Sequence, residues 1–168
     1  MIEVTVDSVK VSLVSQYRIV LLKEVDAERY LPIWIGPFEA EAITMQLRGV
    51  EVPRPLTHDL LKKAITDLGG RISHILVTEL RQDTFYAHIV VDMDGRRVAV
   101  DCRPSDAIAL AVRASAKIFV NEAVMDAGAI VSEPDESGRI SEEEEAKLAA
   151  FSDFIDTLDL DDLGKEKS

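Results

Sequence analysis

The stretch RISHILVTELRQDTFYAHIVVDMDGRRVAVD, residues 71–101, decides the fold because it reads as three strands in direct succession. We expect these strands over residues 71–80, 84–93 and 96–101. Asp94-Gly95, between the last two strands, is a residue pair that favours the type I′ turn of a β-hairpin. Strands joined by short turns pair antiparallel, so this stretch predicts an antiparallel sheet.

The segments on both sides of this stretch extend the same pattern. Toward the N-terminus, alternating apolar and polar residues predict strands, and a change to helical periodicity after Gly36 predicts two helices. Thr57 is expected to cap the second of these helices. Toward the C-terminus, Pro104 opens a further helix. The expected additional strands are 2–13, 17–25, 30–35 and 117–120, and the expected helices are 36–49, 58–68, 105–115 and 121–128. Strands that come in groups with helices between them predict an α+β fold, a mostly antiparallel sheet with helices packed against it.

Charge divides the chain into two parts. The 168 residues carry a net charge of −12, of which residues 1–131, with 15 basic and 18 acidic residues, hold only −3. Residues 132–168, with 4 basic and 13 acidic residues, hold −9, and they open with the linker-like SEPDESGR. We therefore expect an α+β domain over 1–131 and a linker with an acidic amphipathic helix over 132–168.

The acidic tail also has an apolar stripe. Leu148, Phe151, Ile155 and Leu158 follow one another at helical spacing, and Ser141 before four glutamates is a good helix N-cap. One interpretation is a helix over residues 141–163 that packs on its own domain, on a second copy or on a protein partner. The other is a negatively charged arm that competes with nucleic acid for a surface of the body.

Composition excludes several classes of protein. An acidic chain has no basic coat for duplex nucleic acid, and no apolar run approaches the ~18 residues of a membrane span. The single Cys102 excludes a disulfide framework. We expect a cytoplasmic protein that does not enter the membrane.

The corner DCRPSD, residues 101–106, is the first candidate site. Asp101 ends a strand, Asp106 lies in the first turn of the next helix, and Arg103 stands between them. Two carboxylates at such a corner can share a divalent cation such as Mg²⁺ or Mn²⁺, which would polarise a phosphodiester or activate water. The alternative is that Arg103 pairs with one or both acids and fixes the corner.

The segment VPRPLTHDLL is the second candidate site. Arg54-Pro55 precedes a helix start just as Arg103-Pro104 does, and His58 and Asp59 fall in the first turn. A histidine can serve as a general base near neutral pH, or as a metal ligand, and both arginines can hold phosphate. Equally, a histidine at a helix start is often only a hydrogen-bonding residue.

Four blocks of sequence resemble the bifunctional nuclease domain of bacteria and plants. They are LPIWIGPFEAEAI (31–43), RPLTHDLL (54–61), DTFYAHIVV (83–91) and DCRPSDAIALAVR (101–113). The resemblance covers residues 1–131 and implies an α+β fold, a homodimer, and nuclease activity on both RNA and DNA. The motif positions that it carries over are Arg54, His58, Asp59, Asp101, Arg103, Ser105 and Asp106.

These residues combine into one hypothesis, a metal-assisted phosphodiesterase that acts on single-stranded RNA or DNA. Asp101 and Asp106 would hold the cation, and His58 or Asp59 would orient the attacking water. The phosphate would be bound by Arg54 and Arg103, with Ser105 beside them. The alternative is a non-catalytic regulatory or scaffold protein that binds a partner through the body and residues 141–163. A third hypothesis is a site for a small anion at a helix start.

Overall fold

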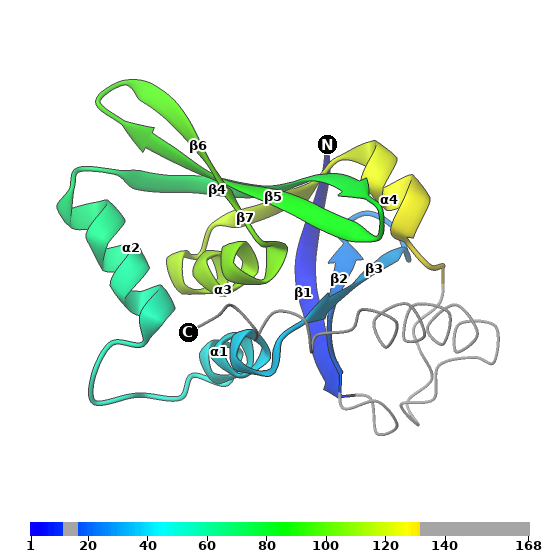
Figure 1. Ribbon diagram of the computed structural model, residues 1–168, viewed down its shortest axis with the longest axis horizontal. Helices are drawn as coiled ribbons and strands as arrows, with labels where there is room; N and C mark the ends of the chain where they lie inside the picture. The colour runs from blue at the N-terminus through cyan, green and yellow to red at the C-terminus, as the bar shows by residue number, and fades with distance from the viewer. Residues whose placement is uncertain (12–16, 132–168) are drawn as a thin grey trace, which may run out of the picture. The chain divides into compact units, whose positions relative to one another are not determined.

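The computed structural model describes residues 1–11 and 17–131 (Figure 1). The predicted helix over 141–163 lies outside the described residues. Within the described part, the elements follow the predicted order. The strands are β1 (Ile2–Val11), β2 (Arg18–Glu24), β3 (Tyr30–Ile35), β4 (Arg71–Arg81), β5 (Thr84–Met93), β6 (Arg96–Cys102) and β7 (Lys117–Val120). The helices are α1 (Pro37–Leu47), α2 (Thr57–Asp67), α3 (Pro104–Ala114) and α4 (Glu122–Gly128).

All the described strands belong to one sheet with the order β3-β2-β1-β7-β4-β5-β6. Every neighbouring pair is antiparallel except β4 and β7, which run parallel. The predicted α+β class and mostly antiparallel sheet are therefore confirmed. The short β7 joins the two antiparallel meanders β1–β3 and β4–β6 into a single sheet.

Helix α3 is the centre of the core. Eight of its residues are buried, and four of these are alanine or proline, whose small side chains let neighbouring elements approach closely. Figure 1 shows α3 beneath the strands β4 and β5, with α1 and α2 beside it. The N-termini of α1, α2 and α3 thereby come to the same region of the molecule.

One detail of the helix starts differs from the expectation. Thr57 was expected to be the N-cap of α2, but the N-cap is Leu56 and Thr57 is the first helical residue. The Leu56 backbone N–H donates to Asp59 Oδ2 over 2.9 Å. A carboxylate three residues into the helix thus accepts the N–H of the N-cap residue, whereas the Thr57 hydroxyl was expected to accept an N–H of the first turn.

Candidate functional site

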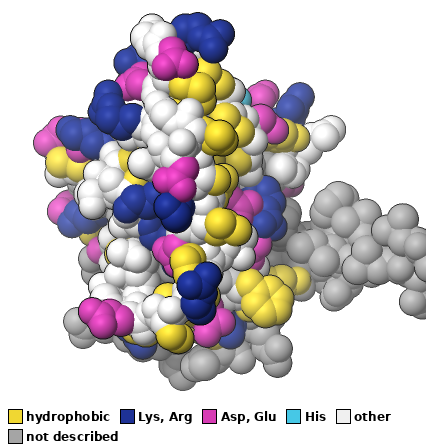
Figure 2. Space-filling view, turned by 90° about the vertical axis from the view of Figure 1, so that its left-hand side faces the viewer, with side chains coloured by type: hydrophobic (Ala, Val, Ile, Leu, Met, Phe, Trp, Pro, Cys, Tyr) yellow, Lys and Arg dark blue, Asp and Glu magenta, His cyan; other side chains and the backbone are white. Residues whose placement is uncertain are grey.

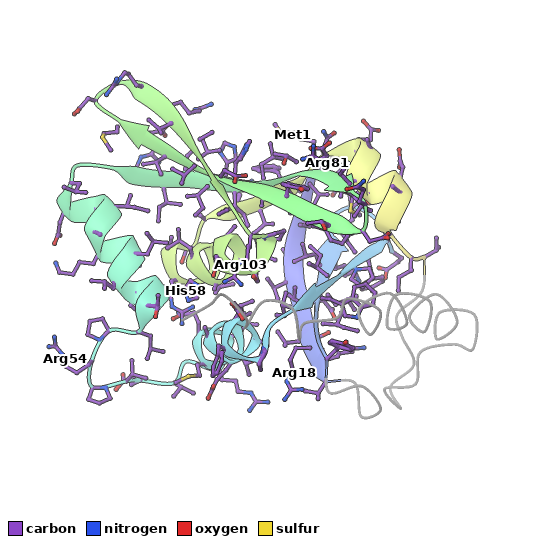
Figure 3. All side chains as sticks on the ribbon, viewed as in Figure 1. Met1, Arg18, Arg54, His58, Arg81 and Arg103 are labelled. Carbon is purple, nitrogen blue, oxygen red and sulfur yellow. The ribbon has the colours of Figure 1, made fainter. Side chains whose placement is uncertain are left out.

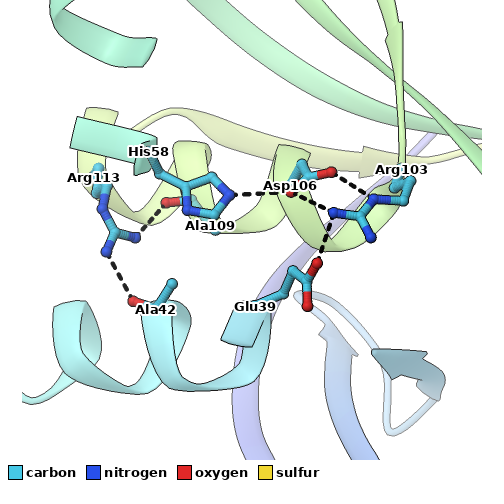
Figure 4. A network of polar contacts seen from close by, with 7 residues as sticks. All are labelled: Glu39, Ala42, His58, Arg103, Asp106, Ala109 and Arg113. Atoms are coloured by element: carbon cyan, nitrogen blue, oxygen red, sulfur yellow. Dashed lines mark hydrogen bonds and ion pairs between the residues drawn. The ribbon is translucent and has the colours of Figure 1, made fainter. Parts of the chain in front are cut away.

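A polar network joins the first turns of three helices (Figure 4). Asp106 of α3 accepts two hydrogen bonds from Arg103, at 2.7 Å from Nε and 3.1 Å from Nη2. His58 Nε2 of α2 lies 3.1 Å from Asp106 Oδ1, and Arg103 Nη2 donates to Glu39 Oε1 of α1 over 2.6 Å. The two helix starts expected to carry chemistry therefore meet, and a third one joins them. We call Glu39, His58, Arg103 and Asp106 the polar network.

The sequence around each helix start explains these positions. Glu39, Asp59 and Asp106 each occupy the third helical position, where the positive end of the helix favours a carboxylate. Asp59 turns back to its own N-cap, whereas Glu39 and Asp106 both reach Arg103, the N-cap of α3. At Gly36 a side chain would collide with the Glu39 carboxylate, so glycine leaves room for that carboxylate beside the α1 N-cap.

Opposing effects set the charge of Asp106. Burial raises the pKa of this carboxyl, but the hydrogen bonds from Arg103 and His58 outweigh burial and bring the pKa below its ordinary value of 3.8. The two carboxylates likewise raise the pKa of Arg103 above its ordinary value. The network therefore holds Asp106 ionised beside a permanent positive charge.

Exposure distinguishes the members of the network. The Arg103 side chain is 66 % exposed, although three of its hydrogen bonds go to carboxylates. Its Nη1 has no partner among the described residues, so two N–H donors remain available to a ligand. His58 is 8 % exposed and lies at the inner end of the network. Figure 3 shows His58 and Arg103 pointing toward the same region between α1 and α3.

The other candidate residues lie apart from this network. Arg54 is exposed on the loop before α2 and points away from Arg103 (Figure 3). Ser105, in contrast, is buried in α3. Asp101 is the second-last residue of β6, and its side chain is 79 % exposed. Among the described residues, its one ion-pair contact is His88 Nε2 at 3.9 Å. Residues 54 and 103 thus precede similar helix starts without forming a common phosphate site in the described part of the chain.

Asp59 belongs to a different cluster, centred on the buried Arg113. Arg113 Nε donates to Asp59 Oδ1 over 2.8 Å. Its two terminal nitrogens donate to the carbonyl oxygens of Ala109 and Ala42 over 2.8 and 2.9 Å. This guanidinium therefore ties α2 and α3 to α1, and Asp59 is one of its braces.

Sequence reasoning missed two residues of these clusters. Neither Glu39 nor Arg113 was among the candidate site residues. The signal for Glu39 was its shared third helical position with Asp106. For Arg113, the signal was an arginine in the last turn of an otherwise apolar helix stretch, where a buried charge must find partners.

The carboxylates do not fit a preformed site for a divalent cation. Both oxygens of Asp106 already accept hydrogen bonds, and Arg103 lies against them. Within residues 1–11 and 17–131, no group of three or more His, Cys, Asp or Glu side chains is placed to hold a metal ion. We therefore derive no chemical step through a cation.

Cys102 lies between Asp101 and the network. Burial, and then the negative charges of Asp106 and Asp101, raise the pKa of its thiol to about 11. Its Sγ donates to the carbonyl oxygen of Ala87 over 3.5 Å. A protonated thiol of this kind is a poor nucleophile, so Cys102 takes no part in the proposed chemistry.

The fold and the network define an α+β domain in which three helix starts converge, with an exposed arginine held by two carboxylates and a histidine beside them. The model of the bifunctional nuclease domain matches residues 20–133, which include all four members of the network. The chain belongs to the bifunctional nuclease domain family.

Relatives fall into two groups. An uncharacterized protein of Mycobacterium tuberculosis is 38 % identical over 161 residues, which cover 95 % of this chain and 96 % of that protein. Bifunctional nuclease 1 of Arabidopsis thaliana is 29 % identical over 128 residues, 73 % of this chain but 38 % of its own length. Bifunctional nuclease 1 of Oryza sativa subsp. japonica is 27 % identical over 111 residues, 64 % of this chain and 34 % of its own length. The chain thus spans about a third of each plant protein.

Proposed function

We propose that this protein is a nuclease that hydrolyses phosphodiester bonds of single-stranded RNA and DNA at the polar network. The observation that carries the proposal is the Arg103 guanidinium. Two carboxylates fix its orientation, yet most of its side chain faces solvent and Nη1 keeps two donors. A guanidinium held in this way can bind a phosphate oxygen with little loss of side-chain entropy.

His58 supplies the base in this proposal. A carboxylate can only accept a hydrogen bond, so Nε2 carries the hydrogen in the contact with Asp106, and Nδ1 of the neutral ring is an acceptor. No buried side-chain nitrogen or oxygen of the described residues lacks a partner. Nδ1 has no hydrogen-bond partner among the described residues, so it is the acceptor that this proposal uses. Asp106 acts as a positioning residue that fixes the tautomer.

The reaction then needs only water as the nucleophile. His58 Nδ1 takes a proton as the water oxygen bonds to phosphorus, and the bond from phosphorus to the leaving sugar oxygen breaks. The leaving oxygen takes up a proton from solvent. Arg103 stabilises the charge that develops on the phosphate. Because no step uses a ribose 2′-hydroxyl, the same site would act on both RNA and DNA.

The test is hydrolysis of labelled single-stranded RNA and DNA by the full chain. We expect Arg103→Ala and His58→Ala to lower kcat/KM about 100-fold or more. Arg71→Ala is the matched control, because Arg71 is an exposed arginine paired with Asp92 on a different part of the surface. A parent protein that cuts no more than a mock preparation would refute the enzyme proposal. Normal cutting by both variants would refute the site.

Two further expectations are tested in the same assay. The mechanism above uses no cation, so it predicts that a chelator leaves cutting unchanged. The metal hypothesis, in which Asp101 and Asp106 hold Mg²⁺ or Mn²⁺, predicts instead that a chelator abolishes cutting and that Asp101→Asn weakens the response to added cation. Binding of phosphate by Arg54 predicts a higher KM for Arg54→Ala. An unchanged response of Asp101→Asn to added cation would remove Asp101 from the site. An unchanged KM of Arg54→Ala would remove Arg54.

The non-catalytic alternative and the expected homodimer make separate predictions. A scaffold that uses residues 141–163 should lose its partner in a pull-down when residues 132–168 are removed. A homodimer should have twice the chain's mass in solution. None of the helices in the described residues is long and apolar enough to cross a membrane. The cytoplasmic location expected from the sequence stays a prediction.

A further inference from the structure

The two edges of the sheet are protected to different degrees. At one edge, β3 contains Pro32, and its residue Tyr30 forms a β-bridge with Ile130. At the other edge, β6 contains no proline, pairs with β5 without a bulge, and has exposed residues from Arg96 to Asp101. A long, regular edge strand with free backbone groups is a template for pairing with another strand.

The hairpin geometry determines which backbone groups of β6 point outward. Asp94 and Gly95 both have positive φ, 50° and 73°, as in a two-residue type I′ turn. The flanking pair, Met93 and Arg96, therefore exchanges hydrogen bonds within the hairpin, and such pairs alternate along the strands. It follows that Arg97, Ala99 and Asp101 direct their N–H and C=O groups away from β5.

We propose that β6 pairs antiparallel with β6 of a second copy of this chain, with Ala99 on the twofold axis. In this register, each residue whose backbone N–H and C=O groups point away from β5 lies opposite another such residue of the second copy. Ala99 faces its symmetry mate, and Arg97 faces Asp101 of the second copy on both sides of the axis. The second copy is favoured over other strands because this pairing places opposite charges across from each other in both places.

In the same register, the side chains on the other face of β6 would form apolar contacts across the interface. Val98 and Val100, 38 % and 46 % exposed, lie opposite Val91 and Ile89, which are buried. Val98 and Val100 therefore extend the apolar inner face of the sheet past β5, to a part of the sheet where the side chains are exposed. Figure 2, which faces α2 and the hairpin end of the molecule, shows hydrophobic side chains gathered in a vertical band. With Ala99 on the axis, Val98 of one copy faces Val100 of the other, and both lose exposure.

The pairing also changes the surroundings of Asp101. Within the described residues, its carboxylate makes one distant ion-pair contact, with His88. The Arg97 side chain is 67 % exposed and bonds Asp92 through Nε over 3.2 Å. Across the proposed interface, Arg97 of the second copy would neutralise Asp101, which lies two residues from Arg103 of the polar network. Each copy would thus contribute a cation beside the other copy's site.

The first test is the mass of the full chain in solution, by light scattering or sedimentation from about 1 to 100 μM. We expect twice the chain mass of 18.6 kDa. Ala99→Pro should give a monomer, since it removes an outward N–H and spares the ladder to β5. Ala99→Ser, which keeps the N–H, should remain dimeric. A monomeric parent, or an Ala99→Pro variant that dimerises like the parent, would overturn the proposal.

The second test examines the register and does not depend on nuclease activity. Arg97→Asp places two like negative charges across the interface, and Asp101→Arg places two like positive charges there. We expect each variant alone to dissociate at least tenfold more readily, and a mixture of the two to form a heterodimer. Circular dichroism checks that both variants fold. If the mixture assembles no better than the separate variants, this register is wrong.

Discussion

The Asp106 carboxylate is held from two sides, by Arg103 of its own corner and by His58 of another helix. Without these partners, partial burial would favour the protonated acid. The hydrogen bonds reverse that preference, because each donor is better satisfied by a carboxylate than by a carboxylic acid. The hydrogen bonds from Arg103 and His58 to Asp106 therefore contribute most stability while Asp106 is ionised.

A pH series on Asp106→Asn tests this coupling. Since the folded-state pKa of Asp106 is lowered, the carboxylate stabilises the fold above its ordinary pKa and loses this effect as the pH falls through the lowered value. We expect the variant to be less stable by about 1–2 kcal/mol at pH 7, with a deficit that shrinks below about pH 4. Urea denaturation at pH 7, 5 and 3 measures this difference in unfolding free energy between the variant and the parent.

The matched control for this series is Asp67→Asn. Asp67 pairs with Lys63 on the exposed face of α2, where an ion pair contributes little. It should show a deficit under about 0.5 kcal/mol at every pH. If Asp106→Asn keeps its full deficit at pH 3, the charge of the carboxylate is not what stabilises the fold.

Cys102 gives a second prediction at the scale of one residue. With burial and two nearby carboxylates raising its pKa to about 11, the thiol is almost fully protonated at pH 8. We expect alkylation by iodoacetamide at pH 8 to be about 100-fold slower than in the urea-unfolded chain, which is its control. The rate should keep rising up to about pH 11. A rate plateau near pH 9 would mean that the thiol is unperturbed.

At the scale of elements, Arg113 explains how three helix starts stay together. One guanidinium donates to a side chain of α2 and to backbone carbonyls of α1 and α3, and it is buried among them. The relative positions of Glu39, His58 and Asp106 thus depend on a residue outside the polar network. Removing it should disturb both stability and the network.

Arg113→Met measures this dependence. Methionine fills similar space but leaves Asp59 and two carbonyl oxygens without their donor, so we expect a loss of about 3 kcal/mol in unfolding free energy. Arg71→Met, at an arginine whose side chain is 77 % exposed and pairs with Asp92, should cost less than about 1 kcal/mol. Equal effects of the two variants in urea denaturation would contradict the bracing role of Arg113.

Local sequence signals predicted the helices and strands, but not which of them would pair or which side chains would contact each other. The Asp94-Gly95 turn, the proline at the start of α3 and the alternation in β1 each depend on neighbouring residues, and those elements formed as predicted. The parallel pairing of the four-residue β7 with β4 joins segments about 40 residues apart. For the same reason, no local pattern showed that His58 would bond Asp106 or that Arg54 would lie apart from Arg103.

At the scale of the whole molecule, charge is divided between a body of −3 and residues 132–168 with −9. The proposed nuclease activity requires that a polyanion bind to this body, and exposed arginines such as Arg103 and Arg54 are groups that would attract it. We expect the negative charge of residues 132–168 to repel the polyanion or to compete for those arginines. Either effect lowers the affinity for nucleic acid, and either is screened by salt.

A chain ending at Val131 should therefore bind a single-stranded oligonucleotide more tightly than the full chain at low salt. We expect about a tenfold gain at ~20 mM salt, falling toward none near 0.5 M as the Debye length shrinks to a few ångströms. Fluorescence anisotropy of a labelled oligonucleotide measures it. The control is the full chain with Glu142–Glu145 changed to glutamine, which keeps the apolar stripe. A partial gain in this variant assigns the effect to charge, whereas equal affinities for all three proteins at every salt concentration would show that the tail does not shield the body.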